Sequence, residues 1–206
     1  MNILAIETST TRGSVALLRG GECVFRKSFA SERSHNSQIF APLGEALALS
    51  KPDLIVAGTG PGSYTGARIG IAAGIGISLS HGARLIGLPS VIAADVADPS
   101  APYHLIGDAR RGSYFYAEVK DRQLIRDPEL IDREALEALL QRDHYLITFD
   151  AKPPAEGIEI RTPAAEILGS IALQMSESEV EALAAAPVVP HYMSAPFVTT
   201  PKKRAP

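Results

Sequence analysis

The chain has 206 residues, of which 46% are hydrophobic and 21% charged, and its formal net charge is −3 at pH 7. These values are typical of a globular protein with a buried core, and the single cysteine, Cys23, excludes a disulfide framework and a cysteine-rich zinc site. The near-neutral charge does not predict autonomous binding to nucleic acid. The uncharged run 69–80 is shorter than the roughly 20 residues that span a bilayer, and the N-terminus lacks the charged segment of a signal peptide. We therefore expect a cytoplasmic protein with no membrane attachment, whose basic end "PKKRAP" is a solvated terminus.

Three strands with short turns are expected first, because apolar residues alternate with polar ones and Gly20-Gly21 marks a tight turn. An amphipathic helix follows, in which apolar residues recur every four positions from Ile39, with Ser34 or Ser37 as its cap. The expected strands of this half cover residues 2–9, 13–20, 22–30, 53–58 and 84–88. The expected helices cover residues 31–50, 63–80 and 90–97.

The second half repeats the opening of the first. In each half an apolar strand is followed by an acid (Glu7, Asp108), by Arg-Gly-Ser (12–14, 111–113) and by an alternating strand, which indicates a duplicated module. The second copy continues with helices over 132–141 and 163–175 and strands over 145–149 and 157–161. We predict an α/β fold of two ribonuclease-H-like modules, β-β-β-α-β-α-β-α, with mixed sheets and flanking helices. The predicted domains are 1–98 and a reduced second copy, 99–206, which lacks a glycine-rich helix and ends in the basic tail.

The stretch "GTGPGSYTGARIGIAAGIG", residues 58–76, combines a turn with a helix. It fails the P-loop pattern because no glycine precedes a lysine. It fails the dinucleotide and nucleophile-elbow patterns because Ser63 and Thr65 stand where those patterns need glycine. What remains is a tight turn over 60–62 and a helix capped by Ser63 or Thr65. The free N–H groups of such a helix start leave a role in anion binding open.

Gly66, Gly70 and Gly74 are spaced four residues apart and share one face of this helix, with Ala73 beside them. Each glycine inside a helix costs about 1 kcal/mol relative to alanine, so a close contact must offset them. That contact is made either with another element of the same chain or with a second protein. Composition does not separate these two alternatives.

Glu7 ends the first strand and is followed by Ser9 and Thr10, a pattern that could hold a hydrated cation and bind phosphate through hydroxyl groups. Asp108 offers a matching acid in the second half. The alternative is that both acids are polar strand ends facing solvent. The five histidines form no H-E-x-x-H or H-x-x-x-H pair, so no metal site is predicted, and no serine or cysteine carries the local signature of a nucleophile.

Four stretches make the chain similar to the TsaB family, subunits of the bacterial machinery that makes threonylcarbamoyladenosine in tRNA. They are "ILAIETST", "SHNSQIFAPL", "GTGPGSYTGARIG" and "GDARRGSYFYAEV", within residues 1–120. The resemblance implies the fold of the actin, sugar kinase and Hsp70 ATPase superfamily. The family usually has Asp at Glu7, Phe at Tyr64 and Leu at Ala67. It tends to have Arg at Ser194, which puts a role for that arginine in doubt here.

The resemblance implies a scaffold subunit that is not itself an enzyme and that activates a larger catalytic paralogue, TsaD, by forming a heterodimer with it. A third protein, the ATPase TsaE, joins them. The substrates of the assembly are threonylcarbamoyl-adenylate and tRNAs that read codons starting with A, and we expect this chain to meet tRNA only indirectly. No cofactor is intrinsic to the chain, and ATP with magnesium is expected only within the complex.

The resemblance also places the pairing surface on helices of the first domain. The implied interface residues are Gly66, Arg68, Gly70, Ala73 and Gly74. Replacing Gly70 with leucine is then expected to abolish complex formation while leaving the fold partly intact. Without its partner, the chain is expected to form a homodimer through the same face.

Two other functions are consistent with the sequence. One is an autonomous small ATPase or sugar-kinase-like phosphotransferase, which requires the isolated chain to bind nucleotide through Glu7, Ser9 and Thr10. The other is a homodimeric binding module with no role in tRNA modification. Binding of ATP and magnesium by the isolated chain separates the first from a scaffold, and an assay of the modified nucleoside after gene deletion separates the second.

Overall fold

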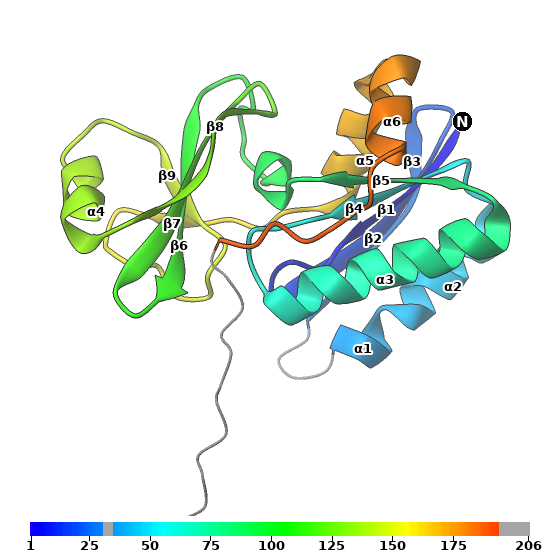
Figure 1. The fold of residues 1–206 in the computed structure, drawn as a ribbon, viewed down its shortest axis with the longest axis horizontal. Coiled ribbons are helices and arrows are strands. Elements are labelled where there is room, and N and C mark those ends of the chain that lie inside the picture. Colours follow the sequence, from blue (N-terminus) through cyan, green and yellow to red (C-terminus); the bar gives the residue numbers. More distant parts are fainter. Residues whose placement is uncertain (31–34, 194–206) are drawn as a thin grey trace, which may run out of the picture.

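A computed structural model describes residues 1–30 and 35–193, and it contains two five-stranded sheets side by side (Figure 1). The first sheet has the strand order β3-β2-β1-β4-β5. Its strands are β1 (Asn2–Glu7), β2 (Arg12–Arg19), β3 (Glu22–Ala30), β4 (Leu54–Gly58) and β5 (Arg84–Leu88). Strand β1 pairs antiparallel with β2 and parallel with β4, so the opening meander and the later crossovers meet at β1.

The second sheet has the order β10-β9-β6-β7-β8, which is the order of the first sheet applied to the second half of the chain. Its strands are β6 (Tyr103–Arg110), β7 (Ser113–Lys120), β8 (Gln123–Ile131), β9 (Leu146–Thr148) and β10 (Glu159–Ile160). Strand β6 pairs antiparallel with β7 and parallel with β9, as β1 does with β2 and β4. The predicted fold class and the duplication are confirmed.

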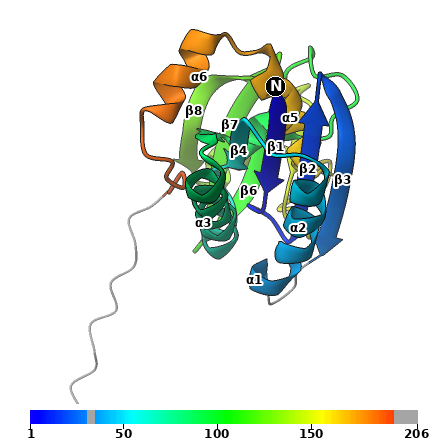
Figure 2. The same ribbon diagram turned by 90° about the vertical axis from the view of Figure 1, so that its right-hand side faces the viewer.

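The helices cover both faces of the first sheet. Helices α2 and α3 lie on one face, and α5 and α6 lie on the other (Figures 1 and 2). The helices are α1 (His35–Gln38), α2 (Phe40–Leu49), α3 (Tyr64–His81), the 3-10 helix η1 (Ser90–Ala93), α4 (Arg133–Leu140), α5 (Ala165–Gln174) and α6 (Glu177–Ala184). Strand β1 supplies both cores because its side chains alternate: Leu4 and Ile6 pack toward α2, while Ile3 and Ala5 pack toward α5.

Local signals in the sequence placed the ends of α3, α4 and α5 within two residues, but the helix expected over 90–97 is the short 3-10 helix η1, and α6 was not predicted. The Ser63 side chain caps α3 by accepting a hydrogen bond from the N–H of Gly66, as predicted. The single helix expected over 31–50 is instead divided into α1 and α2, and Ser37 lies inside α1. The other candidate cap, Ser34, lies outside the described residues, as do Ser194 and the basic tail.

The predicted domain boundary at 98/99 does not separate the packing units, because α5 and α6 return to the first sheet. The N–H of Ala165 donates to Oγ of Ser14 on β2 at 2.9 Å. Gly169 lies so close to Leu18 that a Cβ at this glycine would overlap the leucine side chain. The face of the first sheet opposite α2 and α3 is apolar and must be covered, and α5 and α6 cover it. We call the first sheet with α1, α2, α3, α5 and α6 the first lobe, and the second sheet with α4 the second lobe.

The two lobes are joined by polar contacts to η1. The guanidinium of Arg122 donates to the carbonyls of Ile92 and Ala94, and the Tyr103 hydroxyl donates to the carbonyl of Val91 at 2.6 Å. Burial raises the pKa of Tyr103 to about 12. These contacts fix the second lobe against the first, and with it the cleft between them. Within the described residues, no helix is long and apolar enough to cross a bilayer.

Candidate functional site

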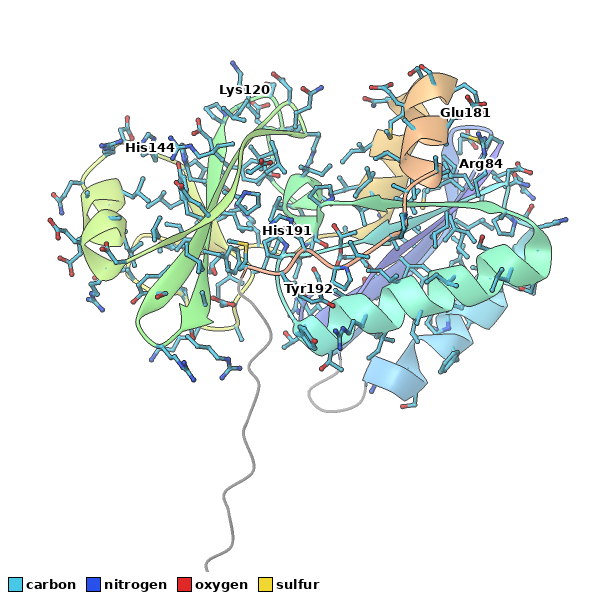
Figure 3. The ribbon with its side chains drawn as sticks, viewed as in Figure 1. Arg84, Lys120, His144, Glu181, His191 and Tyr192 are labelled. Carbon is cyan, nitrogen blue, oxygen red and sulfur yellow. The ribbon has the colours of Figure 1, made fainter. Side chains whose placement is uncertain are left out.

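A cleft of about 1080 Å³ opens between the two lobes. One wall is formed by the segment after β1, by the turn before α3 and by the first turn of α3, and the other wall by the β6–β7 hairpin and the segment after β9. The segment that follows α6 completes the lining, and Figure 3 shows its residues His191 and Tyr192 between the lobes. The side chains that line the cleft include those of Ser9, Thr10, Tyr64, Asp108, Arg110 and Tyr192.

Behind this lining, Glu7 is fully buried at the end of β1. Its Oε1 accepts a hydrogen bond from the N–H of Ser9 at 2.6 Å, whereas its Oε2 has no hydrogen-bond partner among the described residues. Burial raises the pKa of Glu7, and the hydroxyl groups of Ser9 and Ser90 beside the carboxylate oppose the rise. Gly58 faces the carboxylate so closely that any Cβ there would overlap Oε2. Because buried polar atoms are rarely left unpaired, the unpaired Oε2 makes this position unusual.

Two of the three residues predicted to bind nucleotide line the cleft, and Glu7 lies buried behind them. These two are Ser9 and Thr10, and Oγ of Ser9 is buried and has no partner among the described residues. The alternative that Glu7 is a solvent-facing strand end is wrong, because its side chain is fully buried. Whether Glu7, Ser9 and Thr10 hold a nucleotide stays a prediction.

Asp108, the counterpart of Glu7, lines the cleft but is exposed. Its Oδ1 accepts from the N–H of Arg110 at 2.7 Å, and its own N–H donates to Oδ2 of Asp150 at 2.7 Å. Burial raises the pKa of Asp150, and the neighbouring charge of Asp108 adds to the rise. The duplicated acids therefore differ in environment. Asp150, a second acid in the wall that carries Asp108, follows no sequence pattern that predicts it.

The glycine face of α3 packs against the chain's own first sheet. A Cβ at Gly66 would overlap the carbonyl oxygen of Thr8, one at Gly70 would overlap the hydroxyl of the same threonine, and one at Gly74 would lie 3.0 Å from Leu85 Cδ1. These glycines are buried, and they let α3 approach β1 and β5. The glycines therefore make their close contact inside the chain and lie under the outer face of α3 rather than on it. Whether that outer face binds a partner stays a prediction.

The available face of α3 is the opposite one. Leu79 is 82% exposed and Ile75 is 43% exposed, with Ala72 and Gly76 exposed beside them. Two large apolar side chains one turn apart on a solvent-facing helix form a small hydrophobic stripe. Of the other predicted interface residues, Ala73 is partly buried against the core under α2 and α3. The sequence signal for this stripe was the spacing of Ile75 and Leu79, which the regular glycines obscured.

Arg68, the remaining predicted interface residue, is engaged within the chain. Its guanidinium lies 3.9 Å from the ring centroid of Tyr64, and its Nε donates to the hydroxyl of Tyr192 at 2.8 Å. The two tyrosine rings are 5.1 Å apart. The backbone N–H of His191 donates to the carbonyl of Thr59 at 2.8 Å and holds this segment beside the turn before α3. No sequence signal connected these residues.

The described residues contain no group of three histidine, cysteine, aspartate or glutamate side chains arranged to hold a metal ion. Cys23 is partly buried on β3, and burial raises the pKa of its thiol. Cys23 packs against the core under α5.

Two solved structures share this arrangement. YeaZ from Pseudomonas aeruginosa matches with a TM-score of 0.69 at 19% identity, over 93% of this chain and 99% of that one. A P. aeruginosa protein described as similar to the peptidase YeaZ matches with a TM-score of 0.69 at 20% identity, over 94% and 99% of the two chains. The duplicated sheets, their helices and the cleft define an α/β protein of two ribonuclease-H-like modules, the fold of the actin, sugar kinase and Hsp70 ATPase superfamily.

A family model described as "TsaD: tRNA N6-adenosine threonylcarbamoyltransferase" matches residues 30–183. Three curated relatives are named tRNA threonylcarbamoyladenosine biosynthesis protein TsaB. The Bacillus subtilis relative is 30% identical over 159 residues, which is 71% of this chain and 69% of that protein. The Haemophilus influenzae and Escherichia coli relatives are 34% and 32% identical over 58% and 57% of this chain, and the match spans 54% of each of them. The chain belongs to the TsaB family.

Proposed function

We propose that this chain is a non-catalytic scaffold subunit in the biosynthesis of N6-threonylcarbamoyladenosine in tRNA. It forms a heterodimer with a TsaD-like transferase and activates it to modify the position next to the anticodon of tRNAs that read codons starting with A. The observation that carries the proposal is the exposed apolar stripe of α3, in a chain whose relatives are named for this modification. A TsaE-like ATPase completes the assembly, and ATP with magnesium acts only within it.

The stripe has the physical properties of a docking surface. Fully burying a leucine or isoleucine side chain is worth about 1.5–3 kcal/mol, so covering Ile75 and Leu79 supplies a few kcal/mol toward association. Behind the stripe, the glycine face holds α3 tightly on the sheet, so the helix presents these side chains on a rigid support. Rigid presentation lowers the entropy lost on binding. In the absence of the transferase, the same stripe pairs two copies of the chain.

The test is co-purification of the transferase with Leu79→Glu. Leu79 is 82% exposed, so replacing it disturbs no packing in the isolated chain, and the melting temperature should stay within a degree or two of the wild type. Binding to the transferase should weaken at least tenfold, the usual cost of a hot-spot change. Formation of the modified nucleoside in a reconstituted reaction should fall in parallel. Ile125→Glu is the matched control, because Ile125 is 57% exposed on β8 of the second lobe. Equal co-purification with both variants would refute docking through α3.

A second candidate function is favoured by one observation, the unpartnered Glu7 and Ser9 atoms beside the cleft. An autonomous ATPase or sugar-kinase-like phosphotransferase would use that position for a hydrated cation and phosphate. Calorimetry of the isolated chain with ATP and magnesium tests it. Binding that is lost in Glu7→Gln supports the phosphotransferase, and the absence of heat of binding leaves the scaffold proposal alone.

A further inference from the structure

The mouth of the cleft gathers aromatic and cationic side chains that the docking stripe does not use. Tyr64 is 46% exposed and Tyr192 is 40% exposed, and both line the cleft with their ring centroids 5.1 Å apart. Arg68 holds the pair together, since it stacks on Tyr64 and donates to the Tyr192 hydroxyl. Two exposed aromatic rings held at one place form a stacking surface for a planar group.

The facing wall carries a cation at the tip of the β6–β7 hairpin. Arg110 is exposed, lines the cleft and has a φ of 69°, and the next residue, Arg111, has a φ of 57°. The left-handed conformation costs roughly 1–2 kcal/mol for a residue other than glycine. At the β7–β8 turn a similar cost is offset, because Arg122, with a φ of 58°, donates to η1 carbonyls. Within the described residues, the Arg110 guanidinium makes no contact of this kind.

The inner part of the cleft offers polar groups to a ligand. Oγ of Ser9 is buried, lines the cleft and lacks a hydrogen-bond partner among the described residues. The acids Asp108 and Asp150 also line the cleft, and a carboxylate oxygen of each accepts a backbone N–H of the β6 segment, which holds both acids against their own wall. The cleft therefore combines a stacking pair and a cation at its mouth with an unsatisfied hydroxyl further in.

We propose that the mouth of this cleft binds a single-stranded segment of RNA. One base stacks on the Tyr64–Tyr192 pair, the adjacent phosphate lies at Arg110, and the Ser9 hydroxyl bonds to an oxygen of the sugar-phosphate backbone. Proteins recognise unpaired RNA by this combination, in which aromatic side chains take the bases and arginine takes the phosphates. The near-neutral charge of the whole chain does not oppose it, because the binding groups come together only in the fold.

A strand of RNA fits these observations better than a free nucleotide does. The stacking pair lies at the exposed mouth, where a chain can continue on both sides of the bound base, rather than at the enclosed end near Glu7. Tyr64 also stands on the first turn of α3, the helix that carries the proposed docking stripe further along. The inference rests on the proposed function in one respect only, the identification of the RNA with the tRNA substrate of the complex. This chain would then contact tRNA directly.

The test is a titration of the full chain with a single-stranded oligoribonucleotide, followed by amide NMR shifts and by fluorescence anisotropy at several salt concentrations. Shifts should concentrate at Tyr64, Arg68, Arg110 and Tyr192. Tyr192→Ala should weaken binding roughly tenfold or more, the usual loss for one stacked base. Arg110→Ala should reduce the slope of log K against log salt by about 0.7, the value for one phosphate contact on a single strand.

Matched controls separate binding of RNA at this site from nonspecific binding of RNA elsewhere on the surface. Arg142→Ala removes an exposed arginine near the end of α4, and Phe40→Ala removes an aromatic ring that is 63% exposed on α2, so both variants should bind RNA as the wild type does. Tyr192→Phe keeps the ring and should retain most of the affinity. Melting curves identify any variant that loses its fold.

Three results would overturn the inference: no shifts with RNA, equal losses in Arg110→Ala and Arg142→Ala, or the same shifts produced by ATP with magnesium in competition with the RNA. Co-purification of the transferase is measured on the same variants. RNA binding without co-purification supports the inference and refutes the scaffold proposal. Co-purification of the transferase without RNA binding supports the scaffold proposal and refutes the inference.

Discussion

Glu7→Gln should stabilise the protein. The wild-type carboxyl group is fully buried, Oε1 accepts one hydrogen bond from Ser9, and Oε2 has no partner within the described residues. Glutamine keeps an oxygen for the N–H of Ser9 and removes the negative charge that burial disfavours. The NH2 group of glutamine takes the place of Oε2 and can donate to the Ser90 hydroxyl, which lies beside the carboxyl group. Leaving a buried group unsatisfied costs about 1–3 kcal/mol, so the free energy of unfolding at pH 7 should rise by about that amount. For a chain of this size the melting temperature then rises by about 2–4 °C for each kcal/mol.

The dependence on pH gives the sharper check. Because the pKa of Glu7 is raised in the folded protein, the folded state holds this proton at pH values where the unfolded chain has lost it. The contribution of Glu7 to stability is therefore fully present below its ordinary value of 4.5 and is lost as the pH rises through the folded pKa. Glu7→Gln cannot titrate, so its advantage over the wild type should grow as the pH rises from 4.5.

Urea unfolding followed by circular dichroism, from pH 4.5 to 8, measures both effects. Glu181→Gln, an exposed change of the same kind on α6, should leave the curve as it is in the wild type. The reasoning is refuted if Glu7→Gln is less stable than the wild type, or if its advantage does not change with pH. Such a result would mean that Glu7 is a satisfied anion in the folded protein.

Two further predictions concern packing and a buried histidine. Gly70→Ala should destabilise the fold by about 1–3 kcal/mol, because its Cβ overlaps Thr8, whereas Gly76→Ala, which meets nothing within 4 Å, should stabilise it by about 0.5–1 kcal/mol in the same urea experiments. A gain in stability from both alanines would contradict the close approach of α3. His104 is buried against Tyr116, and burial followed by the charge of His144 lowers its pKa below 6.5, although Glu118 opposes the shift. The free energy of unfolding should therefore fall as the pH drops below 6.5. In His104→Gln this fall should be smaller between pH 7.5 and 5.5. An unchanged fall in the variant would mean that another group causes it.

Most of the fold could be predicted from the sequence because its signals are local. The turn at Gly20-Gly21, the buried run of β4 and the cap at Ser63 each depend on a few neighbouring residues. The duplication was visible because both halves carry Arg-Gly-Ser after an acid. The return of α5 to the first sheet was not predictable in this way, because a helix with an apolar face fits either sheet. Its choice depends on which apolar face the rest of the chain leaves uncovered.

The candidate site was predicted only in part, for the same reason. Ser9 and Thr10 follow an acid at a strand end, which is a local pattern, and both line the cleft. The contact between Arg68 and Tyr192 joins residues 124 positions apart, and no spacing rule connects them. Side chains far apart in sequence can be assigned to one site only once the folded walls of the cleft are known.

The helix-propensity cost of the α3 glycines indicates that α3 makes a close contact, but it does not show with what. Three glycines in a helix interior cost about 3 kcal/mol in propensity, and a close contact must offset that cost. The contact is internal, because α3 packs on Thr8 and Leu85 of its own lobe. The cost of the glycines is therefore offset without contact with a second protein. A docking role for α3 must therefore rest on side chains that lose water only when a partner covers them. Leu79 and Ile75 meet that condition, which is why Leu79→Glu tests the proposed interface, whereas Gly70→Leu would test the fold.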